Sequence, residues 1–160
     1  MAIIIRGHTK CRFCGSVIEE GKEVTSFPHF VNNELDPFSV FDDGAFHSDC
    51  FYKHPLADNA EKRYEEILKR NGPSNRVCVV CNKPITDPDD YFTIGHLTDD
   101  QAAPLCAYNY TQAHSSCLSH WAELRQVYEL VKDLQLSGKW GGEGLKSVLL
   151  DLEKAIQDVP

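Results

Sequence analysis

Cysteine and histidine occur in this sequence at spacings that suit metal coordination. Cys11 and Cys14 form a CxxC pair, and after an interval of thirty-two residues His47 and Cys50 form an HxxC pair. A tight turn can point both sulfurs of a CxxC pair at one ion, and side chains at i and i+3 share one face of a helix. Three thiolates and one imidazole suit tetrahedral zinc, so this quartet predicts a Cys3His zinc site.

The same pattern occurs a second time with the same interval. Cys78 and Cys81 form a CxxC pair, and His114 and Cys117 form an HxxC pair after another thirty-two residues. The shift that places Cys11 on Cys78, which we call the repeat shift, superimposes 11–50 on 78–117 without a gap, with eight identities in forty positions. Outside the ligand positions the identities are Ile18/Ile85, His29/His96, Pro37/Pro104 and Ser48/Ser115. We interpret the pattern as an internal duplication and expect two zinc ions per chain.

The donor count predicts what these ions do. A catalytic zinc keeps one coordination position open for water or substrate, whereas a structural zinc is closed by four protein donors. Each quartet supplies four nitrogen or sulfur donors, so we expect two structural sites. Units of this size have small cores, and we expect them to unfold when the metal is removed.

Strands and helices are expected around both quartets. Residues 23–27 and 90–94 are rich in β-branched and aromatic side chains, which predicts a strand in each half. Residues 115–136 have apolar side chains at three- and four-residue spacings and predict one continuous helix that ends before Gly138. In the first half we expect two helical turns over 47–54 and a second helix from Asp58 to about Arg70.

The C-terminal segment predicts one more helix. Residues 144–158 place leucine, valine and isoleucine side chains along one face. We expect this face to pack on the core of the same chain, with self-association and binding in a partner's groove as the alternatives. Residues 137–142 contain three glycines and predict a flexible joint, in which Trp140 is the candidate for an exposed contact with a partner.

The order of knuckle, hairpin and helix around each quartet resembles the treble-clef zinc fingers, a class that includes LIM-like and RING-like modules. The resemblance covers residues 11 to about 137 and implies a small zinc-stabilised α+β fold. LIM modules have shorter ligand spacings, and RING domains interleave eight ligands in a cross-brace. Because the long segment 51–77 separates Cys50 from Cys78, we expect two self-contained sites in series. The predicted domains are 1–72 and 73–138, each a zinc module, followed by a C-terminal helix over 139–160.

Five further cysteine and histidine residues are considered for a role. His29 and His96 occupy the same place in both halves, which would suit the catalytic histidine of a His-metal-finger nuclease. The interpretation we prefer is that each stabilises its hairpin or orients a metal ligand through a hydrogen bond. Cys106 aligns with Ser39 and lies outside the metal pattern, while His54 and His120 are the substitutes if a chosen ligand is wrong.

Charge narrows the choice of partner. The 160 residues include 16 Lys and Arg against 24 Asp and Glu, a net charge of −8, and no Lys or Arg occurs from Pro84 to Leu124. This is the wrong sign for binding a phosphate backbone, so we expect no nucleic-acid partner. The longest apolar run, residues 2–5, is too short to cross a membrane, and seven cysteines without a secretory pattern suit a reducing cytoplasm.

These observations favour a non-catalytic zinc module that binds another protein. The first alternative is a RING-like component of a ubiquitin ligase, which recruits a conjugating enzyme without supplying a catalytic side chain. A DNA-binding regulator and a His-metal-finger nuclease are weaker alternatives. The sequence does not name the partner.

Overall fold

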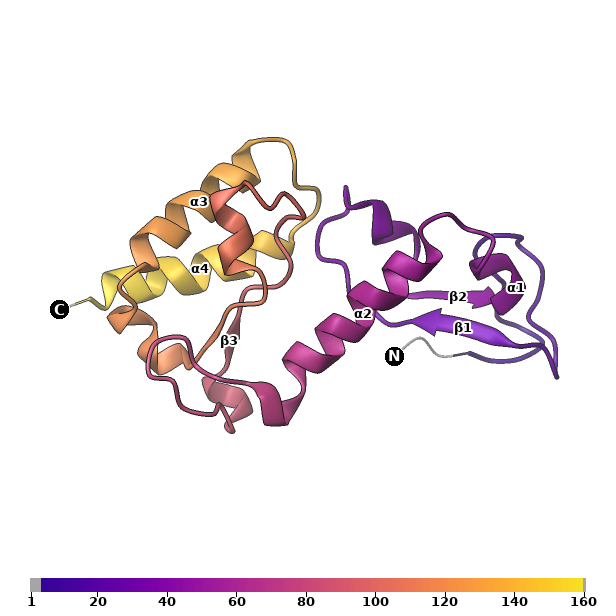
Figure 1. Cartoon of the computed structure of the whole chain (residues 1–160), viewed down its shortest axis with the longest axis horizontal. Helices are drawn as coiled ribbons and strands as arrows, with labels where there is room; N and C mark the ends of the chain where they lie inside the picture. The colour runs from indigo at the N-terminus through magenta and orange to yellow at the C-terminus, as the bar shows by residue number, and fades with distance from the viewer. Residues whose placement is uncertain (1–3, 160) are drawn as a thin grey trace. The chain divides into compact units, whose positions relative to one another are not determined.

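The computed structural model describes residues 4–159 and shows a small mixed fold of short strands and helices (Figure 1). It divides into two compact units. The first consists of Met1–Val31 and Asp36–Ile67, and the second of Asn32–Leu35 and Leu68–Pro160. Residues 1–3 and 160, which the predicted domains include, lie outside the described part. Among the described residues, no helix combines the length and the apolar character that a membrane span requires.

The first unit contains a two-stranded sheet and two helices. Strand β1 (Val24–Phe27) pairs antiparallel with β2 (Gly44–His47), and Val24 lies opposite His47. A single helical turn, α1 (Ser48–Phe51), follows β2 directly, and α2 (Ala57–Asn71) runs on into the second unit. Phenylalanine dominates the core, where Phe41, Phe46 and Phe51 are fully buried. Aromatic rings bury a large apolar area in few residues, which suits a unit of this size.

The second unit repeats this plan on a smaller sheet and adds two helices. Strands β3 (Phe92–Thr93) and β4 (Gln112–Ala113) pair antiparallel, and a 3₁₀ helix over Ser115–His120 follows β4. Helices α3 (Leu124–Leu136) and α4 (Gly144–Gln157) lie side by side (Figure 1). Their facing surfaces bury Val127 and Val131 from α3 and Leu145 and Leu152 from α4. The prediction that the C-terminal helix packs on the chain's own core is confirmed.

The repeat shift of the sequence recurs in the backbone geometry of the two units. Thr25 pairs with Phe46 in the first sheet, and Phe92 pairs with Ala113 at the equivalent positions of the second. The isolated bridges Lys10↔Val17 and Val77↔Pro84 are related by the same shift. Positive φ angles recur as well, at Asp43 (46°) and Tyr110 (60°). The two units therefore share register and turn geometry, although most of their side chains differ.

The helix expected over 115–136 is interrupted, and that prediction is wrong in its middle. The 3₁₀ helix ends at His120, Trp121 has an extended backbone (ψ 116°), and α3 begins at Leu124. At the break the Trp121 ring is buried and meets Tyr108 edge-on, with ring centroids 6.2 Å apart. Similarly, the two turns expected over 47–54 reduce to the single turn α1.

The segment 137–142 is not a flexible joint, and Trp140 is not exposed. Its side chain is 8% exposed and belongs to the core of the second unit. The Asn33 side chain donates a hydrogen bond to the Lys139 carbonyl (3.1 Å) and accepts one from the Gly141 N–H (2.8 Å). A Cβ at Gly144 would lie 2.7 Å from the Asn32 carbonyl oxygen, so glycine is needed for this close approach. Of the glycines that predicted flexibility, Gly141 and Gly142 lie against Glu34 and Leu35, where a Cβ would be too close.

Candidate metal centres

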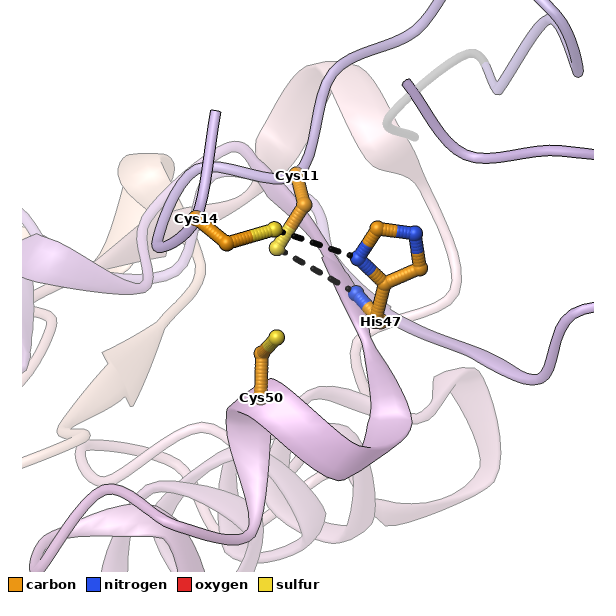
Figure 2. A group of neighbouring side chains, drawn as sticks. All are labelled: Cys11, Cys14, His47 and Cys50. Atoms are coloured by element: carbon orange, nitrogen blue, oxygen red, sulfur yellow. Dashed lines mark hydrogen bonds between the residues drawn. The ribbon is translucent and has the colours of Figure 1, made fainter. Parts of the chain in front are cut away.

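The four side chains of the first quartet meet at one point. Figure 2 shows that Cys11, Cys14, His47 and Cys50 turn their donor atoms toward a common centre, and these atoms all lie within 4.8 Å of one another. Cys11 and Cys14 come from the N-terminal turn, His47 ends β2, and Cys50 lies in α1. The junction of strand and helix therefore delivers the HxxC pair to the CxxC pair. Three thiols and one imidazole at these distances can hold a metal ion.

The second quartet has the same arrangement. The donor atoms of Cys78, Cys81, His114 and Cys117 also lie within 4.8 Å of one another, and no donor of one group belongs to the other. The groups are therefore serial, as the long interval between Cys50 and Cys78 predicts. In a RING cross-brace each metal ion would instead take donors from both quartets.

The imidazole donor in both groups is Nδ1. Cys14 Sγ lies 3.4 Å from His47 Nδ1, and Cys81 Sγ lies 3.4 Å from His114 Nδ1. Around tetrahedral zinc, bonds of about 2.3 Å to sulfur and 2.0 Å to nitrogen place these atoms roughly 3.5 Å apart. The Sγ···Nδ1 distances therefore agree with two ligands of one ion, and the donor set fits zinc.

The two CxxC turns are built by the same backbone hydrogen bonds. Cys11 N–H donates to the Ser16 carbonyl, and Cys78 N–H donates to the Lys83 carbonyl at the equivalent positions. The residue after each second cysteine has a positive φ, 72° at Gly15 and 57° at Asn82, the two residue types that adopt this region most readily. The backbone N–H of each histidine ligand donates to the first sulfur, from His47 to Cys11 (3.4 Å) and from His114 to Cys78 (3.3 Å).

These surroundings lower the pKa of one thiol in each group and raise the pKa of another. Burial alone would raise the pKa of Cys78, but backbone N–H groups, including those of Cys81 and His114, donate to the sulfur and bring the pKa down to about 6. The pKa of Cys117 rises to about 11, because the thiol is desolvated and lies against the other two sulfurs. In the first group the pKa of Cys11 is likewise lowered, and that of Cys50 is raised to about 11. Three thiolates at one point repel one another, and a divalent cation removes that penalty.

Different contacts hold the two HxxC turns. In the second unit Asp90 accepts two hydrogen bonds from Ser116, one from the backbone N–H (2.8 Å) and one from the hydroxyl (2.9 Å). These bonds lower the pKa of Asp90. In the first unit Glu23, the equivalent of Asp90, accepts one hydrogen bond with its backbone carbonyl, from the Ser48 N–H (3.1 Å), and the Thr25 and Ser48 hydroxyls lie 3.1 Å apart. The turn that carries His114 and Cys117 is therefore fixed by a carboxylate, which accepts stronger hydrogen bonds than a hydroxyl.

One pair of residues that the sequence analysis did not single out organises the loop in each unit. Asp42 Oδ1 accepts hydrogen bonds from the backbone N–H groups of Phe30 (2.6 Å) and Val31 (2.9 Å). At the equivalent position of the second unit, Asn109 Oδ1 accepts from Leu97 (2.7 Å) and Thr98 (3.2 Å). The signal was available, since Asp42 and Asn109 align in the shifted sequence and both carry a short side-chain acceptor.

His29 and His96 do not belong to the metal groups. His29 Nδ1 lies 2.7 Å from Asp42 Oδ2, and His96 Nε2 lies 3.1 Å from Asp99 Oδ1. The His29 contact agrees with the interpretation that this histidine stabilises the loop of its hairpin.

The remaining cysteine and the substitute histidines also lie outside the two groups. Cys106 is partly buried, and its sulfur lies 3.9 Å from the Asn109 amide nitrogen. His54 stacks on Phe13 with ring centroids 5.1 Å apart, and His120 contacts the Ser119 hydroxyl. Neither histidine replaces a member of a quartet.

No protein-family model, curated protein or solved structure matches this chain. What the two groups bind is therefore inferred from their donor atoms and distances.

Proposed function

We propose that this chain is a zinc-stabilised protein-interaction module built from two duplicated treble-clef units. The observation that carries the proposal is that each metal position is surrounded by four protein donors, three sulfurs and one nitrogen. A tetrahedral zinc bound this way has no position for water or substrate, so its role is to hold the fold together. Such a rigid, metal-braced surface suits recognition of another protein, and the net charge of −8 disfavours a nucleic-acid partner.

Elemental analysis combined with X-ray absorption tests the metal part of this proposal. Protein purified without added metal is expected to contain about two zinc ions, each with three sulfur and one nitrogen neighbours. Removal of zinc is expected to raise the number of thiols that react with a thiol reagent, because six of the seven cysteines are metal ligands. An oxygen neighbour in the first coordination sphere, or fewer than two zinc ions per chain, would contradict two closed structural sites.

The interaction part needs a separate test. Full-length protein is immobilised beside the variants Cys78→Ser, which removes a ligand, and Cys106→Ser, which changes a cysteine outside both groups. Proteins from the source cell that bind the zinc-loaded chain are then identified, purified and titrated against all three. The proposal expects a direct partner whose affinity survives Cys106→Ser and is lost in Cys78→Ser. It fails if binding is the same for all three proteins or if no purified component binds.

A further inference from the structure

The two metal groups differ in the solvent exposure of one cysteine residue. Cys14 is exposed, whereas Cys81, its equivalent in the second unit, is partly buried. The other members match: Cys11 and Cys78 are both buried, and the remaining cysteines and histidines are intermediate. Exposure of one cysteine residue therefore distinguishes the first group from the second.

The two turns that carry the HxxC pairs also differ in the contacts that hold them. In the second unit the 3₁₀ helix Ser115–His120 contacts α4, and Leu118 is buried in the same core as Leu152. The carboxylate of Asp90 also accepts both hydrogen bonds from Ser116. In the first unit α1 is a four-residue turn, with the contact between the Thr25 and Ser48 hydroxyls behind it. A carboxylate therefore accepts hydrogen bonds from the HxxC turn of the second unit, whereas a backbone carbonyl does so in the first, and bonds to a charged acceptor are the stronger.

From these differences we propose that the first metal centre is a peroxide-sensitive switch and the second a permanent structural centre. This inference rests on the proposed function, because it requires both groups to bind zinc. Among thiolates, the more exposed one is oxidised more readily by peroxide, and loss of zinc unfolds small units that depend on it.

The chemistry uses atoms that already lie together. The Cys14 thiolate attacks one oxygen of hydrogen peroxide, the O–O bond breaks, and a sulfenic acid and one hydroxide form. A second thiolate of the same group, within 4.8 Å, then attacks the sulfenic sulfur, and the second hydroxide leaves as the S–S bond forms. Two thiolates lose two electrons, and one peroxide with two protons becomes two waters. Zinc keeps one sulfur and one nitrogen ligand, too few to hold it, and dissociates.

The consequence is a change confined to one unit. The first unit loses its metal while the second keeps its own, so oxidation removes the metal-braced surface of the first unit and leaves that of the second. Reduction of the disulfide in the presence of zinc restores the site.

Stepwise oxidation of the full chain tests the proposal. A Cys106→Ser background removes the one cysteine outside the groups, so that every remaining thiol belongs to a metal centre. Hydrogen peroxide is added in limiting amounts, released zinc is measured with a chromogenic chelator, and disulfides are mapped by mass spectrometry. We expect one zinc to leave about threefold or more faster than the other, because oxidation follows exposure. The first disulfide is expected among Cys11, Cys14 and Cys50.

A matched pair of variants tests the part played by the second turn. Asp90→Ala removes both acceptors from Ser116, and Asp89→Ala changes the neighbouring exposed aspartate. Release of the second zinc is expected to speed up about threefold in Asp90→Ala and to stay unchanged in Asp89→Ala, since hydrogen bonds behind a ligand tune metal retention.

The starting zinc content separates the two proposals. Fewer than two zinc ions per chain before oxidation would overturn the proposed function. Two zinc ions that leave together, or a first disulfide among Cys78, Cys81 and Cys117, would overturn the switch and leave the structural role intact. A chain that retains both zinc ions under peroxide would also overturn the switch.

Discussion

Replacement of Asp42 by alanine tests whether the loop in the first unit depends on one side chain. Asp42 accepts hydrogen bonds from the backbone N–H groups of Phe30 and Val31 and contacts His29. Alanine leaves two partly buried N–H groups without this acceptor. Each such hydrogen bond contributes about 0.5–1.5 kcal/mol net, so the two together contribute about 1–3 kcal/mol. The His29 side chain is 66% exposed, so its ion pair adds little.

The second unit supplies the matched control. Asparagine stands at the position equivalent to Asp42, and Asn109 Oδ1 makes the same two backbone contacts. Asp42→Asn therefore keeps the essential acceptor and loses mainly the charge. We expect Asp42→Ala to lower the free energy of unfolding of the first unit by about 2 kcal/mol and Asp42→Asn to lower it by less than about 1 kcal/mol.

Residue-resolved amide hydrogen exchange on zinc-loaded protein provides the assay, because it reports each unit separately. Both tryptophans, Trp121 and Trp140, lie in the second unit, so fluorescence unfolding monitors that unit in the same samples. The reasoning would be refuted if Asp42→Ala changed the first unit by less than about 0.5 kcal/mol, half the net value of one hydrogen bond. Equal losses in the two variants would refute it as well, because the charge and not the acceptor would then be responsible.

Three further predictions concern the metal, a buried ion pair and a buried indole. Chelation of zinc is expected to abolish the helical circular dichroism of the described helices, and zinc is expected to restore it; an unchanged spectrum in demonstrably metal-free protein would contradict a structural role. Arg63 lies 2.9 Å from Asp36 and stacks on Phe38, and both charged side chains are at most 10% exposed. Arg63→Met is therefore expected to destabilise the first unit by about 3 kcal/mol in urea unfolding, because it leaves a buried carboxylate unpaired, and a cost below about 1 kcal/mol would show that the pair is effectively solvated. Trp140→Ala is expected to cost the second unit about 3 kcal/mol, against a smaller loss for Trp140→Phe, and equal melting temperatures for wild type and Trp140→Ala would contradict its place in the core.

Much of the local structure could be read from the sequence because it depends on neighbouring residues. The helix expected from Asp58 to about Arg70 occurs as α2 over Ala57–Asn71, and the helix expected over 144–158 occurs as α4 over Gly144–Gln157. An apolar stripe and a glycine or proline boundary are properties of a short window. The strands β1 and β3 also fall within their expected ranges.

The strands that pair with β1 and β3 could not be predicted from the local sequence. β2 and β4 contain four and two residues, and they become strands because they pair with β1 and β3 across long loops. A short window of sequence does not contain the residues of the partner strand, so the pairing cannot be predicted from it. The break at Trp121 has the same origin, since burial of this ring against Tyr108 accompanies the interruption of an otherwise helical pattern.

By itself, then, the sequence determined that two quartets of three cysteines and one histidine occur at one spacing, and that spacing predicted two separate groups. The number of residues between two ligands is set by the covalent sequence, so it is known before the fold is known. Only the tertiary structure decided that Trp140 is buried, that Asp42 and Asn109 hold the loops, and that Cys14 is exposed while Cys81 is partly buried. Burial and hydrogen-bond partners depend on residues far apart in the chain, which identical motifs do not specify.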